Sequence, residues 1–205
     1  MTEDGHIKVI CRFRPLNAKE ISHSSQQFIK ILEYERTVLS RNTYDSTTPL
    51  NFTFDRALKP ETSQASVYDI AGKPIVESVL KGFNGTVLAY GQTSSGKTHT
   101  MLGEESPEEG IIPRMVRTIF TDILESPDDV EFTVKVAYCE IYLEQVRDLF
   151  DPRKQNLRVL EDKTKGIYIQ NITEDYVSTE GELYALLSVG TVSYTHLTLP
   201  TNREV

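Results

Sequence analysis

Alternating apolar and polar residues predict that several short segments of this chain are β-strands. A period of two places successive side chains on opposite faces of a sheet, so that one face is buried and the other is solvated. Segments with this pattern lie at 7–13, 28–32, 38–39, 51–55, 130–141, 157–160 and 166–169. Pro15 ends the first segment, because proline has no N–H to donate to a ladder. The last two segments are predicted to pair as a hairpin.

Apolar residues spaced three and four positions apart predict helices elsewhere in the chain. Helices are predicted at 66–80, 111–124 and 179–188, with an amphipathic turn or short helix at 143–150. Pro74 interrupts the hydrogen-bond ladder of the first helix and predicts a kink there. Gly82, just after Lys81, marks the predicted end of the same helix.

A nearly uncharged run at 85–90 predicts a strand that is buried on both faces. A glycine-rich turn, Gly91 to Gly96, follows this run and leads into a helix start at Lys97. Strands and helices alternate along the chain, and no internal repeat or linker interrupts them. The economical interpretation is one α/β domain.

Composition and charge narrow the function classes. The chain has 205 residues, which is enough for one domain with a core. Its net charge of −8 and the lack of a basic stripe argue against nonspecific nucleic-acid binding, and they give no electrostatic argument for an acidic polymer as partner. No apolar run approaches the roughly 20 residues that span a bilayer, so no membrane contact is expected. Cys11 and Cys139 lie far apart in apolar runs, which favours a reduced compartment over a disulfide framework.

The strongest chemical signal is a match to the phosphate-binding pattern G-x-x-x-x-G-K-[ST], placed between a predicted buried strand and a helix start. Its glycines allow backbone conformations that turn N–H groups toward an anion. Lys97 is predicted to contact the β- and γ-phosphates, and the Thr98 hydroxyl to ligate Mg²⁺. The predicted cofactors are therefore ATP and Mg²⁺. The predicted ATP-binding residues are Gly91, Gln92, Thr93, Ser94, Ser95, Gly96, Lys97 and Thr98.

Hydrolysis needs further groups: an acid that holds Mg²⁺ through water, and a group that places the attacking water. Asp69 begins an Asp-x-x-Gly sequence, but it lies upstream of the loop in a helical pattern, so we interpret it as a helix-surface residue. Glu140 and Asp162 follow strand-like runs and are alternatives for a metal-side acid, although solvated carboxylates are the simpler interpretation. No catalytic residue is identified.

Several segments together resemble the kinesin motor domain, in its order and at its spacing. These segments lie at 7–15, 54–55, 67–68, 84–86, 89–101, 110–113, 140–144 and 148–149. The resemblance runs from about residue 6 to about residue 190 and is nearest to the conventional heavy-chain members of that family. Phe54 and Asp55 are interpreted as packing and strand-end anchoring residues.

The resemblance implies an α/β P-loop NTPase fold with a kinesin-type mixed central sheet and helices on both faces. It also implies binding of Mg-ATP, hydrolysis coupled to movement along microtubules, and a location in the cytoplasm and on the cytoskeleton. Arg12, Arg14 and Pro15 match the family's Arg-x-Arg-Pro element, which lines the adenine pocket, and His99 would close that pocket. From the residues alone, the arginines are as well explained as solvated residues beside a strand, and His99 as a surface residue.

The departures from the family pattern are also informative. Neither the Asn-x-x-Ser-Ser-Arg-Ser-His switch nor the Asp-Leu-Ala-Gly-x-Glu switch occurs in the sequence. We therefore expect residues 1–190 to be the N-terminal part of a C-terminally truncated motor domain, and 191–205 to be a non-family tail. The main microtubule-binding helix and the dimerisation stalk are expected to lie outside this chain. Without later strands, Val87 and Leu88 are expected on an unpaired, exposed edge, which predicts poor solubility.

Three functions are compatible with these residues. The first is an enzyme, a microtubule-stimulated ATPase motor of which this chain is one part. The second is a nucleotide-binding module that binds ATP but neither hydrolyses it nor moves. The third, a P-loop ATPase outside the motor class, is disfavoured by the matches that flank the loop. Lys163 and Lys165 suggest a minor tubulin contact, which the acidic Glu174 and Asp175 oppose.

Overall fold

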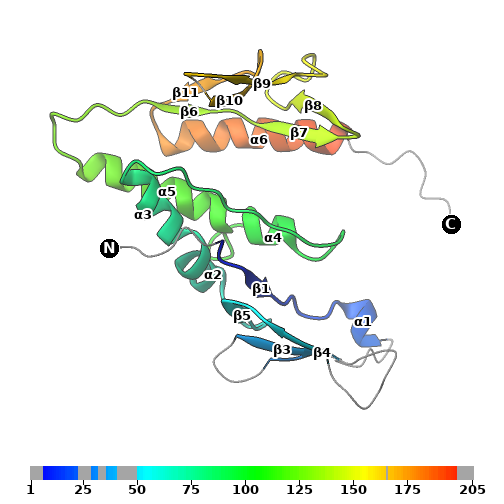
Figure 1. The fold of residues 1–205 in the computed structure, drawn as a ribbon. Coiled ribbons are helices and arrows are strands. Elements are labelled where there is room, and N and C mark those ends of the chain that lie inside the picture. Colours follow the sequence, from blue (N-terminus) through cyan, green and yellow to red (C-terminus); the bar gives the residue numbers. More distant parts are fainter. Residues whose placement is uncertain (1–6, 23–28, 32–35, 41–49, 165, 198–205) are drawn as a thin grey trace. The chain divides into compact units, whose positions relative to one another are not determined.

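The computed structural model describes two compact units of the chain. The described residues are 7–22, 29–31, 36–40, 50–164 and 166–197. The amino-terminal unit comprises residues 1–115 and the carboxy-terminal unit residues 116–205, with the boundary inside one helix. Helices and strands are present in both units (Figure 1), so the predicted α/β class is confirmed.

In the described part of the amino-terminal unit, the strands form two short sheets. They are β1 (Ile10–Arg12), β2 (Ile29–Ile31), β3 (Thr37–Ser40), β4 (Leu50–Thr53) and β5 (Arg56–Leu58). β1 pairs in parallel with β5, and β3 lies between β2 and β4 in an antiparallel sheet. The strands predicted at 7–13, 38–39 and 51–55 are confirmed as β1, β3 and β4. The strand predicted at 28–32 is described only at its centre, as β2, and its two end residues lie outside the described residues.

The segment that was predicted to form one helix with a kink at Pro74 is divided into two helices of this unit. The helices of the unit are α1 (Ala18–Ser22), α2 (Gln64–Ala71), α3 (Lys73–Leu80), α4 (Lys97–Met101) and the first part of α5 (Ile111–Glu125). Ser63 caps α2, since its Oγ accepts a hydrogen bond from the Ser66 N–H at 3.2 Å. Gly72 separates α2 from α3. Pro74 lies in the first turn of α3, where its missing N–H removes no helical bond.

The core of the amino-terminal unit lies where α2 and the start of α5 meet the β1–β5 ladder. Its buried cluster consists of Leu58, Val67, Tyr68 and Ile111. A partly buried side chain of β1 packs against the same cluster. Gly72 leaves room for the Tyr68 ring and for Ile111 of α5, because a Cβ there would lie 2.7 Å from Cδ2 of Tyr68 and 3.2 Å from Cγ2 of Ile111. This core fixes β1 against α2, and both elements contribute to the site described below.

The segment 85–90 differs from the buried strand that its sequence predicts. Within the described residues it forms no ladder, and the side chains of Leu88 and Tyr90 are 83% and 96% exposed. Val87 packs against the core cluster but is only partly buried. A strand is buried on both faces only where neighbouring strands and covering layers surround it. The exposed, unpaired edge expected at Leu88 is therefore confirmed.

Leu88→Lys is expected to raise the soluble fraction of the chain several-fold, because it removes an exposed apolar side chain and places a charge on an unpaired edge. Sedimentation of freshly expressed protein measures this fraction. Leu124→Lys is the matched control, since Leu124 is 86% exposed but lies outside the edge segment, and a smaller gain is expected there. A cooperative thermal transition of the unchanged chain, with protected amides across 85–90, would contradict the prediction.

The carboxy-terminal unit contains three antiparallel strand pairs and a long helix. Its elements are β6 (Val134–Val136), β7 (Cys139–Tyr142), β8 (Gln145–Asp148), β9 (Val159–Asp162), β10 (Gly166–Ile169), β11 (Asp175–Val177) and α6 (Glu180–Leu197), with the rest of α5. β6 pairs with β11, β7 with β8, and β9 with β10. The hairpin predicted at 157–160 and 166–169 is confirmed as β9 and β10, and the helices predicted at 111–124 and 179–188 as α5 and α6. The long strand predicted at 130–141 is divided into β6 and β7.

Of the turn or short helix predicted at 143–150, only a turn at 143–144 is confirmed, and the helix is wrong. Half of this segment is β8, which pairs with β7 so that Tyr142 lies opposite Gln145. Leu143 and Glu144 form the turn between the two strands, with φ angles of 49° and 61°. Two consecutive left-handed residues are the geometry of a tight hairpin turn, which usually contains Asn or Gly. Because neither residue type is present, the sequence lacks the signal that identifies such a hairpin.

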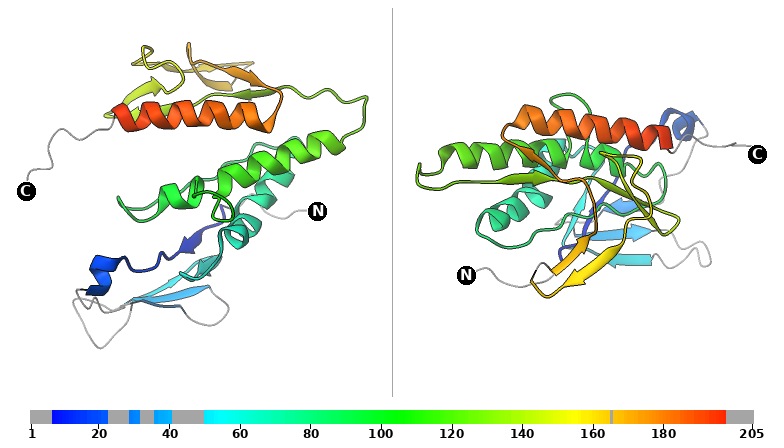
Figure 2. Two further views of the ribbon diagram at one scale, coloured as in Figure 1. Left: turned by 180° about the vertical axis from the view of Figure 1, so that it is seen from behind. Right: turned by 90° about the horizontal axis from the view of Figure 1, so that it is seen from above.

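Helix α6 packs along the segment that contains β6 and β7 in the carboxy-terminal unit, as the views in Figure 1 and Figure 2 show. Gly190 of α6 is buried, and a Cβ at this position would collide with the ring of Tyr138. The helix continues to Leu197, beyond its predicted end at residue 188, and residues 198–205 lie outside the described residues. None of the helices in the described part of the chain is both long and apolar enough to cross a bilayer.

Candidate functional site

The glycine-rich loop has the backbone conformations that its motif predicts. Ser94 and Gly96 have φ angles of 64° and 99°, in the left-handed region. A Cβ at Gly91 would lie 2.5 Å from Oγ of Ser95, so the loop leaves no room for a side chain there. The loop ends directly at the start of α4, which begins at Lys97. These left-handed residues are backbone conformations that glycine-rich turns allow, and phosphate binding by the loop stays a prediction.

Lys97 spans this loop from inside. Its Nζ donates hydrogen bonds to the carbonyl oxygens of Gly91 and Gln92, at 2.7 and 2.8 Å. A lysine ammonium has three N–H donors, so one remains for an oxygen of an anion bound in the loop. The structure therefore places a cation where the sequence predicts the phosphates.

Thr98 follows at the start of α4 with an exposed side chain. Across the residues that the structure describes, no three His, Cys, Asp or Glu side chains lie together as they would to hold a metal ion. The Thr98 hydroxyl is of the ligand type that Mg²⁺ prefers, and its role as metal ligand stays a prediction from the motif.

Strand β1 brings the predicted adenine-pocket residues to the loop and to α4. A Cβ at Gly96 would lie 4.0 Å from Cβ of Arg14. Arg12 donates a hydrogen bond from Nη1 to a threonine hydroxyl of α4 at 2.9 Å. Pro15, next to Arg14, and His99, on α4, are both exposed. Residues far apart in the sequence are therefore gathered beside the loop.

Arg14 is held by α1. Its Nη1 and Nη2 donate to the two carboxylate oxygens of Glu20, at 2.7 and 2.6 Å. Glu20 also accepts from the Asn17 N–H at 2.8 Å, and the Glu20 N–H donates to Asn17 Oδ1 at 2.9 Å, which together form a capping box. The hydrogen bond from Arg14 and that from Asn17 lower the pKa of Glu20 to about 2. Glu20 therefore stays ionised, and the pair stays charged, at all but strongly acid pH.

Gln64 is the residue of this site that sequence reasoning missed. Its side chain is only 2% exposed, and it contacts both Arg12 and α4. A signal was present, because Gln64 shares a helix face with Val67 and Tyr68, three and four residues further on. A polar residue on an otherwise apolar stripe of a helix is expected to be buried and to form hydrogen bonds with other buried groups.

The comparisons with known proteins identify the family. A family model described as the kinesin motor domain matches residues 12–204. The chain belongs to this family. A kinesin heavy chain from Syncephalastrum racemosum is 45% identical and covers 98% of the chain, and the human kinesin-1 heavy chain is 43% identical and covers 90%. A solved structure of a fast kinesin superposes with a TM-score of 0.87 at 39% identity over 96% of the chain, which confirms the predicted kinesin-type P-loop fold.

The chain spans only part of these kinesins. It covers 22% and 19% of the two heavy chains, and 56% of the solved fast kinesin. The family match itself runs past residue 190. The division of the chain into a motor part and a tail at that point stays a prediction.

The three acidic residues that were considered for a metal-side role, Asp69, Glu140 and Asp162, lie on different elements of this kinesin chain. Asp69 is exposed on α2. Glu140 lies on β7 opposite Arg147 of β8, and within the described residues one Glu140 oxygen and the Arg147 Nε are buried without hydrogen-bond partners. Asp162 ends β9, where its Oδ1 accepts the Thr164 N–H at 2.8 Å. A metal-side role for Glu140 or Asp162 stays a prediction.

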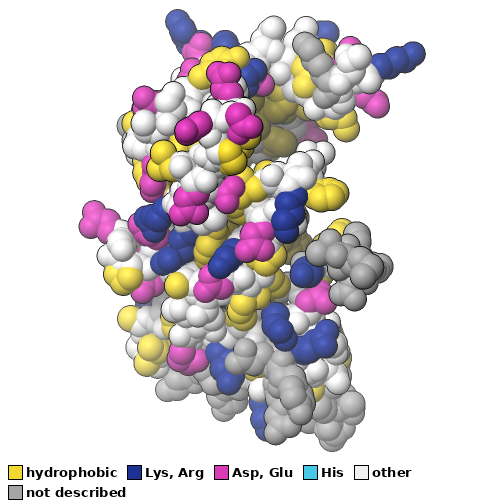
Figure 3. All heavy atoms as spheres, turned by 90° about the vertical axis from the view of Figure 1, so that its left-hand side faces the viewer, with side chains coloured by type: hydrophobic (Ala, Val, Ile, Leu, Met, Phe, Trp, Pro, Cys, Tyr) yellow, Lys and Arg dark blue, Asp and Glu magenta, His cyan; other side chains and the backbone are white. Residues whose placement is uncertain are grey.

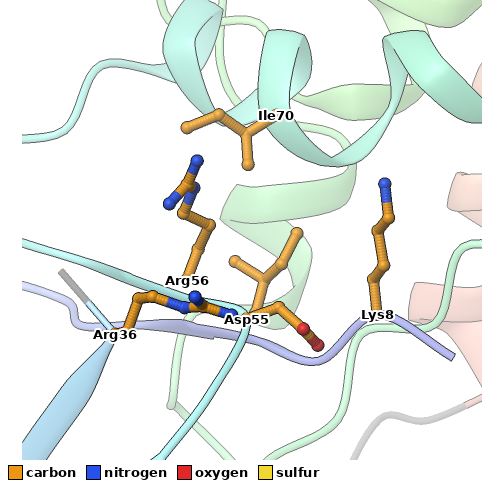
Figure 4. A pocket seen from close by; sticks show the side chains of 6 residues that line it. Lys8, Arg36, Asp55, Arg56 and Ile70 are labelled. Carbon is orange, nitrogen blue, oxygen red and sulfur yellow. The ribbon is translucent and has the colours of Figure 1, made fainter. Parts of the chain in front are cut away.

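A cavity of about 380 Å³ lies elsewhere in the amino-terminal unit of this kinesin chain. It is lined by Lys8, Ile10, Arg36, Asp55, Arg56 and Ile70, and Figure 4 shows Ile70 descending from α2 toward the strand residues. Asp55 accepts the Val9 N–H on Oδ2 at 2.7 Å, so it anchors the entry to β1 as the sequence predicted. The lining contains none of the predicted ATP-binding residues.

Proposed function

We propose that this chain is the ATP-binding part of a microtubule-based motor ATPase, which couples ATP hydrolysis to movement along microtubules. The observation that carries the proposal is Lys97, whose Nζ lies 2.7 and 2.8 Å from two carbonyl oxygens of a glycine-rich loop that has left-handed residues at Ser94 and Gly96. The relatives named kinesin heavy chain and the fast kinesin support the motor assignment.

The roles of the chain's own residues follow from their positions. The N–H groups of Gly91 to Gly96 bind the phosphate chain, and Lys97 contacts its β- and γ-oxygens. The Thr98 hydroxyl holds Mg²⁺, which neutralises charge on the terminal phosphates when it is bound with the nucleotide. These assignments agree with the exposed side chain of Thr98 and the free third donor of Lys97.

The base of the nucleotide lies on the β1 side of the loop in this proposal. Arg14 and Pro15 form one wall, supported by the 4.0 Å approach of Arg14 to the Gly96 position. Arg12 supports α4, and His99 on that helix closes the pocket. Because Glu20 fixes both guanidinium nitrogens of Arg14, the wall is preorganised before nucleotide binds.

Microtubules as partner, and a cytoplasmic, cytoskeletal location, belong to the same proposal. Figure 3 shows Lys and Arg side chains interspersed with Asp and Glu side chains over much of the face that it displays. The microtubule assignment rests on the kinesin relatives.

The alternative is a module that binds ATP without hydrolysing it. The observation that favours it is the sequence, which contains neither switch motif of the family, while the only Asp-x-x-Gly sequence begins at Asp69, an exposed residue of α2. In this alternative the loop, Lys97 and Thr98 keep the roles given above.

ATP turnover with and without microtubules distinguishes the two proposals. The 205-residue chain is expected to bind ATP with no turnover above background, because no group that places the attacking water is identified in it. A chain extended by about 140 residues, to the size of a full domain, is expected to hydrolyse ATP faster when microtubules are added. Turnover by the shorter chain would contradict the assignment of the missing groups to the extension.

A further inference from the structure

Gln64 is a buried amide whose hydrogen-bonding groups are all used. Its Oε1 accepts from Nη1 of Arg12 at 2.9 Å. Its Nε2 donates to the carbonyl oxygen of His99 at 2.7 Å and to that of Glu108 at 3.1 Å. A side-chain amide has two N–H donors, so both are engaged. One side chain on α2 thereby joins β1, α4 and the loop that follows α4.

Arg12 depends on this amide for its orientation. The same Nη1 that contacts Gln64 also donates to Oγ1 of Thr100 at 2.9 Å, so the guanidinium is fixed between α2 and α4. Burial acts to lower the pKa of Arg12, and the charge of Glu108 acts in the opposite direction. A partly buried cation with two neutral acceptors is costly to leave without partners, so loss of the amide frees Arg12 to move.

Helix α4 depends on the amide as well. It has only five residues, Lys97–Met101, which is too short for its own hydrogen bonds to fix its direction. The Gln64 amide holds its carbonyl at His99, and the backbone of Gly110 donates to Leu102 just past its end, at 2.8 Å. The position of His99 relative to β1 is thus set from α2.

We propose that Gln64 is a positioning residue for the base side of the nucleotide site. By holding Arg12 and the His99 backbone together, it makes the site prefer a nucleoside triphosphate over a bare polyphosphate. Among the described residues Lys97, which contacts the phosphates in the proposed function, bonds to the carbonyl oxygens of Gly91 and Gln92 and not to Gln64. The inference rests on the proposed function, since it requires that ATP binds in this loop.

The test compares the affinities of the 205-residue chain for Mg-ATP and for Mg-tripolyphosphate, by calorimetry. Gln64→Leu is expected to weaken Mg-ATP binding about tenfold, the effect of losing one hydrogen bond to a charged group, and to change tripolyphosphate binding less than about twofold. Gln145→Leu, the same change at an exposed position of β8, is expected to alter neither affinity. Equal weakening for both ligands by Gln64→Leu would overturn the proposal, since it would indicate a general loss of structure.

A double-mutant cycle with Arg12→Met tests whether Gln64 acts through Arg12. The double variant is expected to bind Mg-ATP no more weakly than Arg12→Met alone, whereas additive losses would overturn the proposal. If circular dichroism shows that Gln64→Leu does not fold, Gln64→Asn replaces it. This variant keeps the amide but shortens the side chain by one methylene, so that the amide no longer reaches its partners. It is expected to show the same selective loss of Mg-ATP binding. A wild-type chain that binds tripolyphosphate as tightly as ATP overturns this inference alone. A wild-type chain that binds neither ligand overturns the proposed function.

Discussion

Lys97→Ala is expected to lower the affinity of the chain for Mg-ATP by at least about tenfold, because one phosphate contact to a charged donor is worth about 1.5–3 kcal/mol. The substitution also removes the hydrogen bonds to the carbonyl oxygens of Gly91 and Gln92, at 2.7 and 2.8 Å, which brace the loop. Calorimetric titration or fluorescence of a labelled nucleotide measures the change.

Lys163→Ala is the matched control for this prediction. Lys163 lies in the turn between β9 and β10, and its side chain is exposed. It carries the same charge as Lys97, so the control separates a local effect from the change in net charge. Unchanged Mg-ATP binding by a chain with both Lys97→Ala and Thr98→Ala would refute the nucleotide site and the proposed function with it.

Asp148→Ala is expected to destabilise the carboxy-terminal unit by about 3 kcal/mol or more, because it leaves three backbone N–H groups without an acceptor at about 1–3 kcal/mol each. Asp148 is fully buried. Its Oδ1 accepts from the N–H groups of Phe150 and Asp151, at 2.8 and 3.0 Å, and its Oδ2 from that of Thr173, at 2.7 Å. Urea unfolding, followed by amide exchange of these three N–H groups, measures the loss.

The control is Asp129→Ala, at an exposed position between α5 and β6. It removes the same charge and is expected to change the free energy of unfolding by less than about 0.5 kcal/mol. An Asp148→Ala chain that keeps its amide protection at Phe150 and Thr173 would contradict the bracing role assigned to this carboxylate.

The pH dependence of unfolding gives a second readout for the same residue. Burial acts to raise the pKa of Asp148, but hydrogen bonds from Thr173, Asp151 and Phe150 outweigh it and hold the pKa below its ordinary range. A carboxyl with a depressed folded pKa contributes stability that is present above its unfolded value of about 3.9 and is lost as the pH falls through the folded value. The unchanged chain should therefore lose this contribution below about pH 4, while Asp148→Ala should lack that part of the acid transition.

Sequence patterns predicted those helices and strands whose formation depends on residues close to one another in the sequence. The helix at 66–80 was predicted with an interruption at Pro74, and the break lies two residues earlier, at Gly72, because proline fits the first turn of α3 but not a helix interior. The hairpin of β9 and β10 was predicted because its two strands adjoin in sequence. By contrast, β8 was missed, since Leu143 and Glu144 adopt left-handed conformations that neither residue type favours. There the cross-strand pairing with β7 overrides the local preference.

The phosphate-binding loop was predicted from the sequence for a different reason. The loop needs glycine at position 91, where a Cβ would contact Ser95, and at position 96, where φ is 99°. Phosphate binding therefore requires particular residue types at a fixed spacing, which a sequence motif can identify. Gln64 has no such fixed spacing to its partners. Arg12 is 52 residues before it and His99 is 35 residues after it, and only folding brings them within hydrogen-bond distance.

The sequence by itself determined the kinesin family, the loop from Gly91 to Thr98 and the helical or extended character of most segments, because backbone conformation and apolar periodicity are short-range properties. Only the tertiary structure decided that Arg14 pairs with Glu20 and that Gln64 joins Arg12 to α4. Burial and hydrogen-bond partners depend on which distant segments meet, and no local pattern specifies that.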